Sequence, residues 1–153
     1  MANINQPEFN DSRDHPGFNA RRWKVGHLEG AQKTGLSYWE VDPGQAAYPY
    51  HTHLTEEEIL VILEGSPSLR TPEGWRELAQ GEVVVFPTGE AGAHQLVNKT
   101  EQTVRFLAFS NSGEPEIVIQ LDAGKYGVRD GGSQTTEWFR REDAVGYFEG
   151  LDA

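Results

Sequence analysis

The sequence predicts an all-β domain whose strands pair antiparallel in a sandwich or barrel. Between residues 34 and 121, short runs rich in β-branched and aromatic residues recur about every ten residues. Glycine, proline, asparagine or aspartate separates one run from the next, as expected for the turns between antiparallel strands. The chain contains no repeat of about 20–50 residues and no low-complexity tract. A length of 153 residues suits one such domain.

Each expected strand is an apolar and β-branched run that ends where turn residues begin. In chain order, the expected strands are 34–41, 59–63, 68–71, 75–78, 82–86, 94–98, 103–110 and 116–122. The turns between them are expected at 42–44, 64–67, 72–74, 79–81, 87–92, 98–100 and 111–115. This spacing indicates several short strands rather than a few long ones.

The two ends of the chain are expected to be less regular. Residues 1–20 are polar and rich in turn residues, so they are predicted to be an N-terminal arm in front of a barrel at 21–124. Residues 125–153 are predicted to be a C-terminal extension that packs on the barrel. Its expected parts are a glycine-rich loop at 125–134, a short strand at 136–139 and a short helix at 141–148.

The composition excludes several classes of function. The chain has 13 Lys and Arg residues against 24 Asp and Glu residues, and a net charge of −11 would repel nucleic acids and anionic membranes. It has no cysteine, which excludes disulfides, zinc–thiolate sites and a cysteine nucleophile. We see no signal-peptide pattern, and the longest aliphatic run, Ile59–Leu63, is too short to span a membrane. A cytoplasmic protein is therefore expected, with any metal held by nitrogen and oxygen.

The histidines carry the strongest chemical signal. His51 and His53 lie two positions apart on an extended segment, so both imidazoles project from one face and can converge on one ion. Glu58 opens the following strand, and a tight turn would bring its carboxylate to the same place. On that strand Glu58 shares a face with Leu60 and Ile62, where an unpaired carboxylate would be costly.

A third histidine can join this group. His94 begins the expected strand 94–98, which follows the strand 82–86 across a Pro/Gly loop. If these two strands form a hairpin in the same barrel, His94 reaches the ion that the other residues hold. Glu57 is an alternative to Glu58 as the carboxylate ligand.

These residues resemble the two sequence motifs of the cupin superfamily. The first motif reads G-x6-H-x-H-x4-E-x6-G from Gly44 to Gly65, and the second reads G-x5-P-x-G-x4-H-x3-N from Gly81 to Asn98. Relative to the family pattern, the first has one extra residue before its histidines and the second has two extra residues before its histidine. Both insertions fall in loops, where added residues are tolerated.

The resemblance implies a double-stranded β-helix, the jelly-roll barrel of the cupins, with one divalent transition metal. The ligands that the motifs carry over are His51, His53, Glu58 and His94. Imidazole and carboxylate ligands suit iron, manganese, nickel, copper or zinc without choosing between them. A vestigial, metal-free site is the alternative.

Strand parity indicates which residues would surround a substrate. Leu60, Ile62 and Leu96 are expected to form an apolar wall that excludes water, and Arg105 could face inward to bind a substrate carboxylate. Ordinary structural roles are expected for several neighbours: Tyr48 and Tyr50 outside the pocket, Glu56 in a solvated turn, and His15 and His27 at the surface.

The leading functional hypothesis is a metal-dependent enzyme that acts on a small organic molecule, and oxygen-dependent oxidation is the favoured reaction. Four protein ligands would leave positions on the ion for substrate and dioxygen. The alternatives are cupin isomerase or lyase chemistry and a non-catalytic cupin that binds a carboxylate or sugar. No general base can be identified. A homodimer through residues 1–40 is expected, because small cupins commonly pair through sheet edges.

Overall fold

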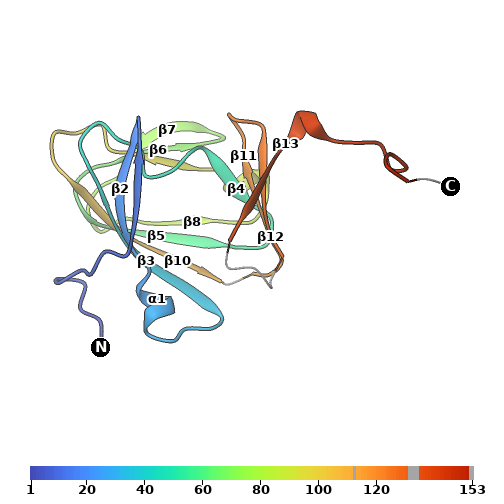
Figure 1. Ribbon diagram of the computed structural model, residues 1–153. Coiled ribbons are helices and arrows are strands. Elements are labelled where there is room, and N and C mark those ends of the chain that lie inside the picture. Colours follow the sequence, from blue (N-terminus) through green and yellow to red (C-terminus); the bar gives the residue numbers. More distant parts are fainter. Residues whose placement is uncertain (112, 131–134, 152–153) are drawn as a thin grey trace.

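A computed structural model describes residues 1–111, 113–130 and 135–151. Within them the chain consists of short antiparallel strands with little helix, so the expected all-β class is confirmed. The strands form three sheets that together make the double-stranded β-helix seen in Figure 1. No helix in these residues is long and apolar enough to cross a membrane.

The largest sheet has six strands and supplies most of the core. In spatial order its strands are β1 (Asp11–His15), β2 (Phe18–Trp23), β3 (Thr34–Val41), β10 (Val104–Asn111), β5 (Glu58–Glu64) and β8 (Val83–Phe86). β10 pairs with β3 on one side and with β5 on the other. Phe106 on β10 therefore lies beside both Trp39 and Ile62, which are far away along the chain.

Two smaller sheets complete the barrel. The first contains, in order, β13 (Glu137–Arg140), β12 (Lys125–Arg129), β11 (Glu116–Gln120) and β4 (His51–His53). The second contains β7 (Gly74–Glu77), β6 (Ser68–Thr71) and β9 (Gln95–Val97). Two isolated bridges, Ala46 with Val97 and His51 with His94, connect the stretch around β4 to the stretch around β9. Helical structure in the described residues is limited to α1 (Val25–Leu28) and the single 3-10 turns η1 (Glu90–Gly92) and η2 (Arg141–Asp143).

The core lies between these sheets and is built by strand alternation. Leu60 and Ile62 on β5 and Phe106 on β10 are almost completely buried. The ring of Trp39 stacks on that of Phe106, with centroids 5.8 Å apart. Burial of such side chains is the main driving force for folding. Glu58 precedes Leu60 on the same face of β5, so the apolar row ends in a carboxylate.

The ends of the chain differ from the sequence-based expectation. Residues 11–15, expected in an irregular arm, form β1 and pair with β2 in a regular hairpin. Lys125–Arg129, expected to be a loop, forms β12, while 131–134 lie outside the described residues. The expected helix at 141–148 is replaced by the single turn η2, and the chain after β13 runs away from the barrel (Figure 1). Side chains in this segment, such as Tyr147, are exposed, so a helix here would have no apolar face packed on the barrel to stabilise it.

The hairpin between 82–86 and 94–98, which was the condition for His94 to reach the other ligands, does not form. β8 pairs with β5 in the six-stranded sheet, and β9 pairs with β6 in the three-stranded sheet. The Pro/Gly loop and η1 therefore carry the chain from one sheet to another instead of reversing it within one sheet. His94 still reaches the region expected for it, through its bridge to His51.

Candidate metal centre

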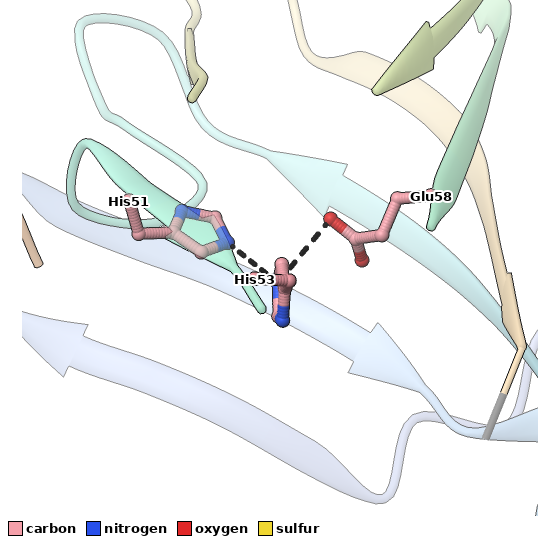
Figure 2. Close-up of side chains that lie close together, drawn as sticks. All are labelled: His51, His53 and Glu58. Atoms are coloured by element: carbon pink, nitrogen blue, oxygen red, sulfur yellow. Dashed lines mark hydrogen bonds and ion pairs between the residues drawn. The ribbon is translucent and has the colours of Figure 1, made fainter. Parts of the chain in front are cut away.

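Strand alternation and one turn bring two histidines and a carboxylate together. His51 and His53 occupy the two ends of β4 and project from the same face, whereas Thr52 between them turns to the other face. The chain then reverses, and Glu58 returns at the start of β5. Ligand atoms of His51, His53 and Glu58 lie within 4.8 Å of one another, so these residues could hold a metal ion. Figure 2 shows the three side chains converging from the two strands.

The ligand atoms of this group are the imidazole Nε2 atoms and one carboxylate oxygen. His51 Nε2 lies 3.1 Å from His53 Nε2, and His53 Nε2 lies 3.5 Å from Glu58 Oε2 (Figure 2). His94 Nε2 lies 3.1 Å from the same Glu58 oxygen. The structure therefore brings His51, His53 and Glu58 together and places His94 against the same carboxylate.

His94 is held rigidly although it lies outside a regular strand. Its backbone exchanges two hydrogen bonds with His51, of 2.8 and 3.1 Å. Its ring stacks on Phe86, with centroids 3.8 Å apart and planes 9° from parallel. Its Nε2 is buried beside Glu58 and, within the described residues, has no hydrogen-bond partner. A buried nitrogen without a hydrogen bond is costly, and coordination of an ion would satisfy it.

The second nitrogen of each imidazole is already engaged. Each Nδ1 faces an oxygen acceptor: Pro49 O for His51 at 2.9 Å, Gly92 O for His94 at 2.9 Å and Glu116 Oε1 for His53 at 3.2 Å. An Nδ1 that donates to such an oxygen leaves the lone pair of the neutral ring on Nε2. Metal-binding histidines in proteins are oriented in this way. The three Nε2 atoms are thus prepared to act as ligands.

At His51 and Glu58, electrostatics favour the protonation states that bind a metal, whereas the carboxylates around His53 raise the pKa of that imidazole against the effect of its burial. Burial, together with the neighbouring His94 and His53, lowers the pKa of His51 to about 3. Burial alone would raise the pKa of Glu58, but the imidazoles of His94, His53 and His51 lower it to about 2. His51 is therefore neutral and Glu58 ionised near neutral pH. A neutral imidazole and a carboxylate are the forms that coordinate metals.

This donor set fits a divalent transition metal. It offers three imidazole nitrogens and a carboxylate oxygen, the ligand types preferred by such ions. The set does not identify which metal is bound.

A cavity of about 230 Å³ opens beside these residues, with His51, His53 and Glu58 in its wall. The opposite parts of the wall come from distant segments of the chain. They include Arg13, Arg22, Trp39, Tyr48, Glu56 and Arg129. We refer to His51, His53, Glu58 and His94 as the histidine cluster. A small molecule in this cavity would lie against both the histidine cluster and a set of charged and aromatic side chains.

The residues expected to surround a substrate are divided by the structure. Leu60 lines the cavity. Ile62 and Leu96 are buried in the core and are not part of the cavity wall. Both side chains point into the barrel, as their strand positions predicted, but the cavity does not extend as far as either of them.

The structure corrects the expectation that Arg105 faces inward and binds a substrate carboxylate. Its Nε donates to Glu40 Oε1 at 2.8 Å, and its terminal nitrogen pairs with Glu64. Its neighbours Val104 and Phe106 are completely buried, so the alternation of β10 directs Arg105 to the outer face. It therefore stabilises neighbouring strands from outside and does not contact a substrate in the cavity.

Several residues for which the sequence predicted ordinary structural roles line the cavity instead. Glu56, expected in a solvated turn, is only 11% exposed, lines the cavity and pairs with Arg129. Tyr48, expected outside the pocket, packs edge-on against His51 with centroids 4.9 Å apart. Tyr48 lies in an irregular stretch before β4, where strand parity does not apply. Arg22 lies two positions after the buried Ala20 on β2, and residues two apart on a strand share a face, so this spacing could have indicated that Arg22 faces inward.

Glu116 had no sequence signal at all, because it is 63 residues from the histidine that it orients. It is buried, and it accepts hydrogen bonds from His53 Nδ1 and from the backbone of Leu54 and Thr55, all at 3.2 Å. Burial acts to raise its pKa, but the hydrogen bonds from His53 and Thr55 lower it. Glu116 therefore remains an acceptor that fixes the ring of His53.

We expect Glu116→Gln to weaken metal binding by about 10- to 100-fold, the usual effect of removing such an orienting partner. Whichever way the new amide turns, its NH2 group faces an N–H donor of this cluster. Competition with a chromogenic chelator would measure the affinity. Glu57→Gln, at an exposed neighbouring carboxylate, is the matched control and should retain the wild-type affinity. Equal affinities in the two variants would show that Glu116 does not orient a ligand.

Comparison with known proteins relates the chain to one family. A family model described as a cupin domain matches residues 37–110, which contain all four residues of the histidine cluster. No curated protein matches the chain.

Several solved structures share the fold. A sugar phosphate isomerase from a cupin superfamily, from Silicibacter pomeroyi, has a TM-score of 0.82 and 21% identity and covers 94% of each chain. The polyketide cyclase RemF from Streptomyces resistomycificus has a TM-score of 0.63 and 28% identity, over 76% of this chain and 82% of the other. A cupin 2 conserved barrel domain protein from Rhodopseudomonas palustris has a TM-score of 0.54 and 19% identity, over 69% of both chains.

Proposed function

This chain belongs to the cupin superfamily, and on that premise we propose that it is a metal-dependent enzyme acting on a small organic substrate. The proposed ligands of one divalent ion are His51, His53, Glu58 and His94. The observation that carries the proposal is the convergence of three Nε2 atoms on one carboxylate while every Nδ1 is already engaged.

A bound divalent ion would act as a Lewis acid that polarises an oxygen of the substrate. The chain supplies the surroundings that such chemistry needs. Leu60 and Trp39 form apolar parts of the cavity wall and limit the access of water to the substrate. A cavity beside the ligands would hold the substrate against them, and binding there supplies part of the entropic cost of bringing the reacting groups together.

The geometry favours a non-redox reaction that moves a proton, as in an isomerisation or a cyclisation. Glu56 lines the cavity and is not a proposed ligand. Burial raises the pKa of its carboxyl group, although Arg129 opposes this effect. A raised pKa makes a carboxylate a stronger base, so it is better suited to take up and return a proton. We therefore assign Glu56 as the candidate general base, and the likeness to a polyketide cyclase at 28% identity supports this class of chemistry.

Oxygen-dependent oxidation is the second candidate. It is favoured by the composition of the site, because a set of three histidines and one carboxylate leaves positions on an ion for both substrate and dioxygen. It would not need Glu56 as a base. Oxygen consumption during turnover therefore distinguishes the two reactions.

The first experiment is elemental analysis of the full chain, purified without a chelator or a metal-affinity step. About one ion of iron, manganese, nickel or zinc per chain is expected. Addition of each metal to chelator-treated protein, followed by an activity screen in air and under argon, then separates the reactions. Turnover under argon supports proton transfer, and turnover only in air supports oxidation. Binding of small molecules without turnover under both conditions would indicate a non-catalytic cupin, and failure to bind any metal would refute the proposal.

We also propose that the protein is a cytoplasmic homodimer that pairs through residues 1–40. β1 forms one edge of the six-stranded sheet, and an unpaired edge favours association with a second strand. Light scattering at micromolar concentration should give twice the mass of the 17.1 kDa chain. A monomer mass would contradict the dimer without affecting the proposed metal site.

A further inference from the structure

The cavity beside the metal centre contains positive charge that the chain itself does not neutralise. Arg13 on β1 and Arg22 on β2 both line this cavity. Within the described residues, neither of them pairs with a carboxylate. The arginines that do have a carboxylate partner are Arg21, Arg70, Arg76, Arg105, Arg129 and Arg140. Arg141 also lacks a carboxylate partner among the described residues, but it is exposed in η2, whereas Arg13 and Arg22 line a cavity.

The β1–β2 hairpin aims both guanidinium groups at the same place. In the register of the hairpin Arg13 lies opposite Ala20, which is two positions from Arg22, so both arginines share the inner face. Arg13 Cζ lies 5.2 Å from the centre of the Trp39 ring, and Arg22 Cζ lies 5.0 Å from it. Arg22 is further positioned by the hydrogen bond from its Nε to Ser37 Oγ, at 2.9 Å.

The same wall contains buried donors that have no acceptor. Arg13 Nε, Trp39 Nε1 and Tyr48 Oη are buried and, in the part of the chain that the structure describes, have no hydrogen-bond partner. All three residues line the cavity. The two N–H groups can only donate, and the Tyr48 hydroxyl can donate as well. Because buried donors in folded proteins are nearly always satisfied, this wall calls for a ligand rich in oxygen acceptors.

Charge leads to the same ligand chemistry. Arg129 pairs with Glu56, which leaves Glu58 as the one carboxylate without an arginine partner among the described wall residues. A divalent ion on Glu58 would make this region more positive still. Burial of two like charges beside each other is costly, and burial lowers the pKa of both guanidinium groups. A bound anion would offset this cost, although the chain as a whole carries a net charge of −11.

We propose that Arg13 and Arg22 form a subsite that binds an oxyanion of the substrate, either a carboxylate or a phosphate group. The guanidinium fork matches the oxygen atoms of both groups. The inference rests on the proposed function, because it places the remainder of the substrate at the metal centre in the same cavity. The cavity, at about 230 Å³, lies below the range usual for drug-sized ligands, so the substrate is a small anionic molecule.

Titration calorimetry of the full chain with two probes, inorganic phosphate and acetate, tests this subsite. The chain would be measured both metal-loaded and after chelator treatment, since an anion could also bind to the ion itself. We expect Arg13→Gln and Arg22→Gln each to weaken binding of the preferred probe by about 10- to 100-fold, the usual effect of losing a charge-assisted hydrogen bond. Tighter binding of phosphate would indicate a phosphate-bearing substrate, and tighter binding of acetate a carboxylate.

Arg21→Gln is the matched control, because Arg21 lies on the same strand but pairs with Glu40 on the other side. It should leave the affinity for either probe unchanged. If the glutamine variants do not fold, Arg13→Lys and Arg22→Lys retain the charge and lose the fork, and each should weaken binding by a smaller factor. Affinities equal to the wild type in these variants, or no binding of either probe, would overturn the subsite.

Metal content, measured on the same samples, separates this inference from the proposed function. The arginine variants should retain the metal content of the wild type, because neither arginine belongs to the histidine cluster. Arginine-dependent anion binding in a protein that never takes up metal would support the subsite and refute the metal-dependent enzyme. Full metal content with arginine-independent anion binding would give the opposite result.

Discussion

His51→Ala is expected to abolish both metal binding and turnover. His51 supplies an Nε2 atom 3.1 Å from that of His53, and its backbone bridge to His94 connects the two halves of the centre. Removal of an orienting partner alone usually costs about 10- to 100-fold in metal affinity, so loss of a ligand should cost more. Elemental analysis of the purified variant would measure the metal per chain, and turnover would be followed after addition of excess metal.

His27→Ala is the control for this prediction. His27 lies exposed on α1, outside the cavity wall, and its replacement should leave both the metal content and the turnover at wild-type levels. The circular dichroism spectrum of each variant would show whether the barrel is intact. A folded His51→Ala protein that retained one metal per chain would contradict the proposed ligand set, and turnover that survived metal loss would contradict the proposed mechanism.

Gly92→Ala is expected to disrupt the same centre from outside the ligand set. A Cβ at this position would lie 1.7 Å from the carbonyl oxygen of Pro87, which belongs to the backbone and cannot move alone. The carbonyl oxygen of Gly92 also holds His94 Nδ1 at 2.9 Å. The loop must therefore shift, and His94 must shift with it. Overpacking of this kind usually costs about 1–3 kcal/mol of stability.

The measurements for Gly92→Ala are the melting temperature and the metal affinity, and both should fall. Ala91→Ser provides the control, because Ala91 lies in the same turn, η1, with its side chain exposed. Its replacement should change neither quantity. If Gly92→Ala kept the wild-type metal affinity, the turn would not be what positions His94.

The metal centre and the arginine pair together define how a substrate would lie. The histidine cluster comes from β4, β5 and the loop after η1, whereas Arg13 and Arg22 come from the N-terminal hairpin. Although the chain as a whole is acidic, the cavity between them contains two arginines that have no carboxylate partner among the described residues. The local positive charge attracts an anion small enough to enter the cavity, whereas the net charge of −11 on the chain as a whole repels a polyanion such as a nucleic acid.

Most of the fold could be predicted because it depends on local patterns. The run that became β3 was bounded correctly at both ends, since turn residues follow it directly. The His-x-His spacing predicted one shared face, and Glu58 was correctly placed on the face of Leu60. The hairpin β1–β2 was missed because its residues are mostly polar, and the two buried residues of β2, Ala20 and Trp23, lie on opposite faces instead of forming one apolar row. Its strand character comes from pairing with β3, a contact that no local window contains.

Local patterning was therefore sufficient for the all-β class, the family and the grouping of the histidines with Glu58. Side-chain period and turn chemistry act over a few residues, and these can be read along the chain. The orienting role of Glu116, the outward direction of Arg105 and the unpaired arginines of the cavity followed only from the folded arrangement. Each depends on which distant segments meet. The hydrophobic packing that brings those segments together is non-directional, so no local sequence pattern specifies which segments will be neighbours.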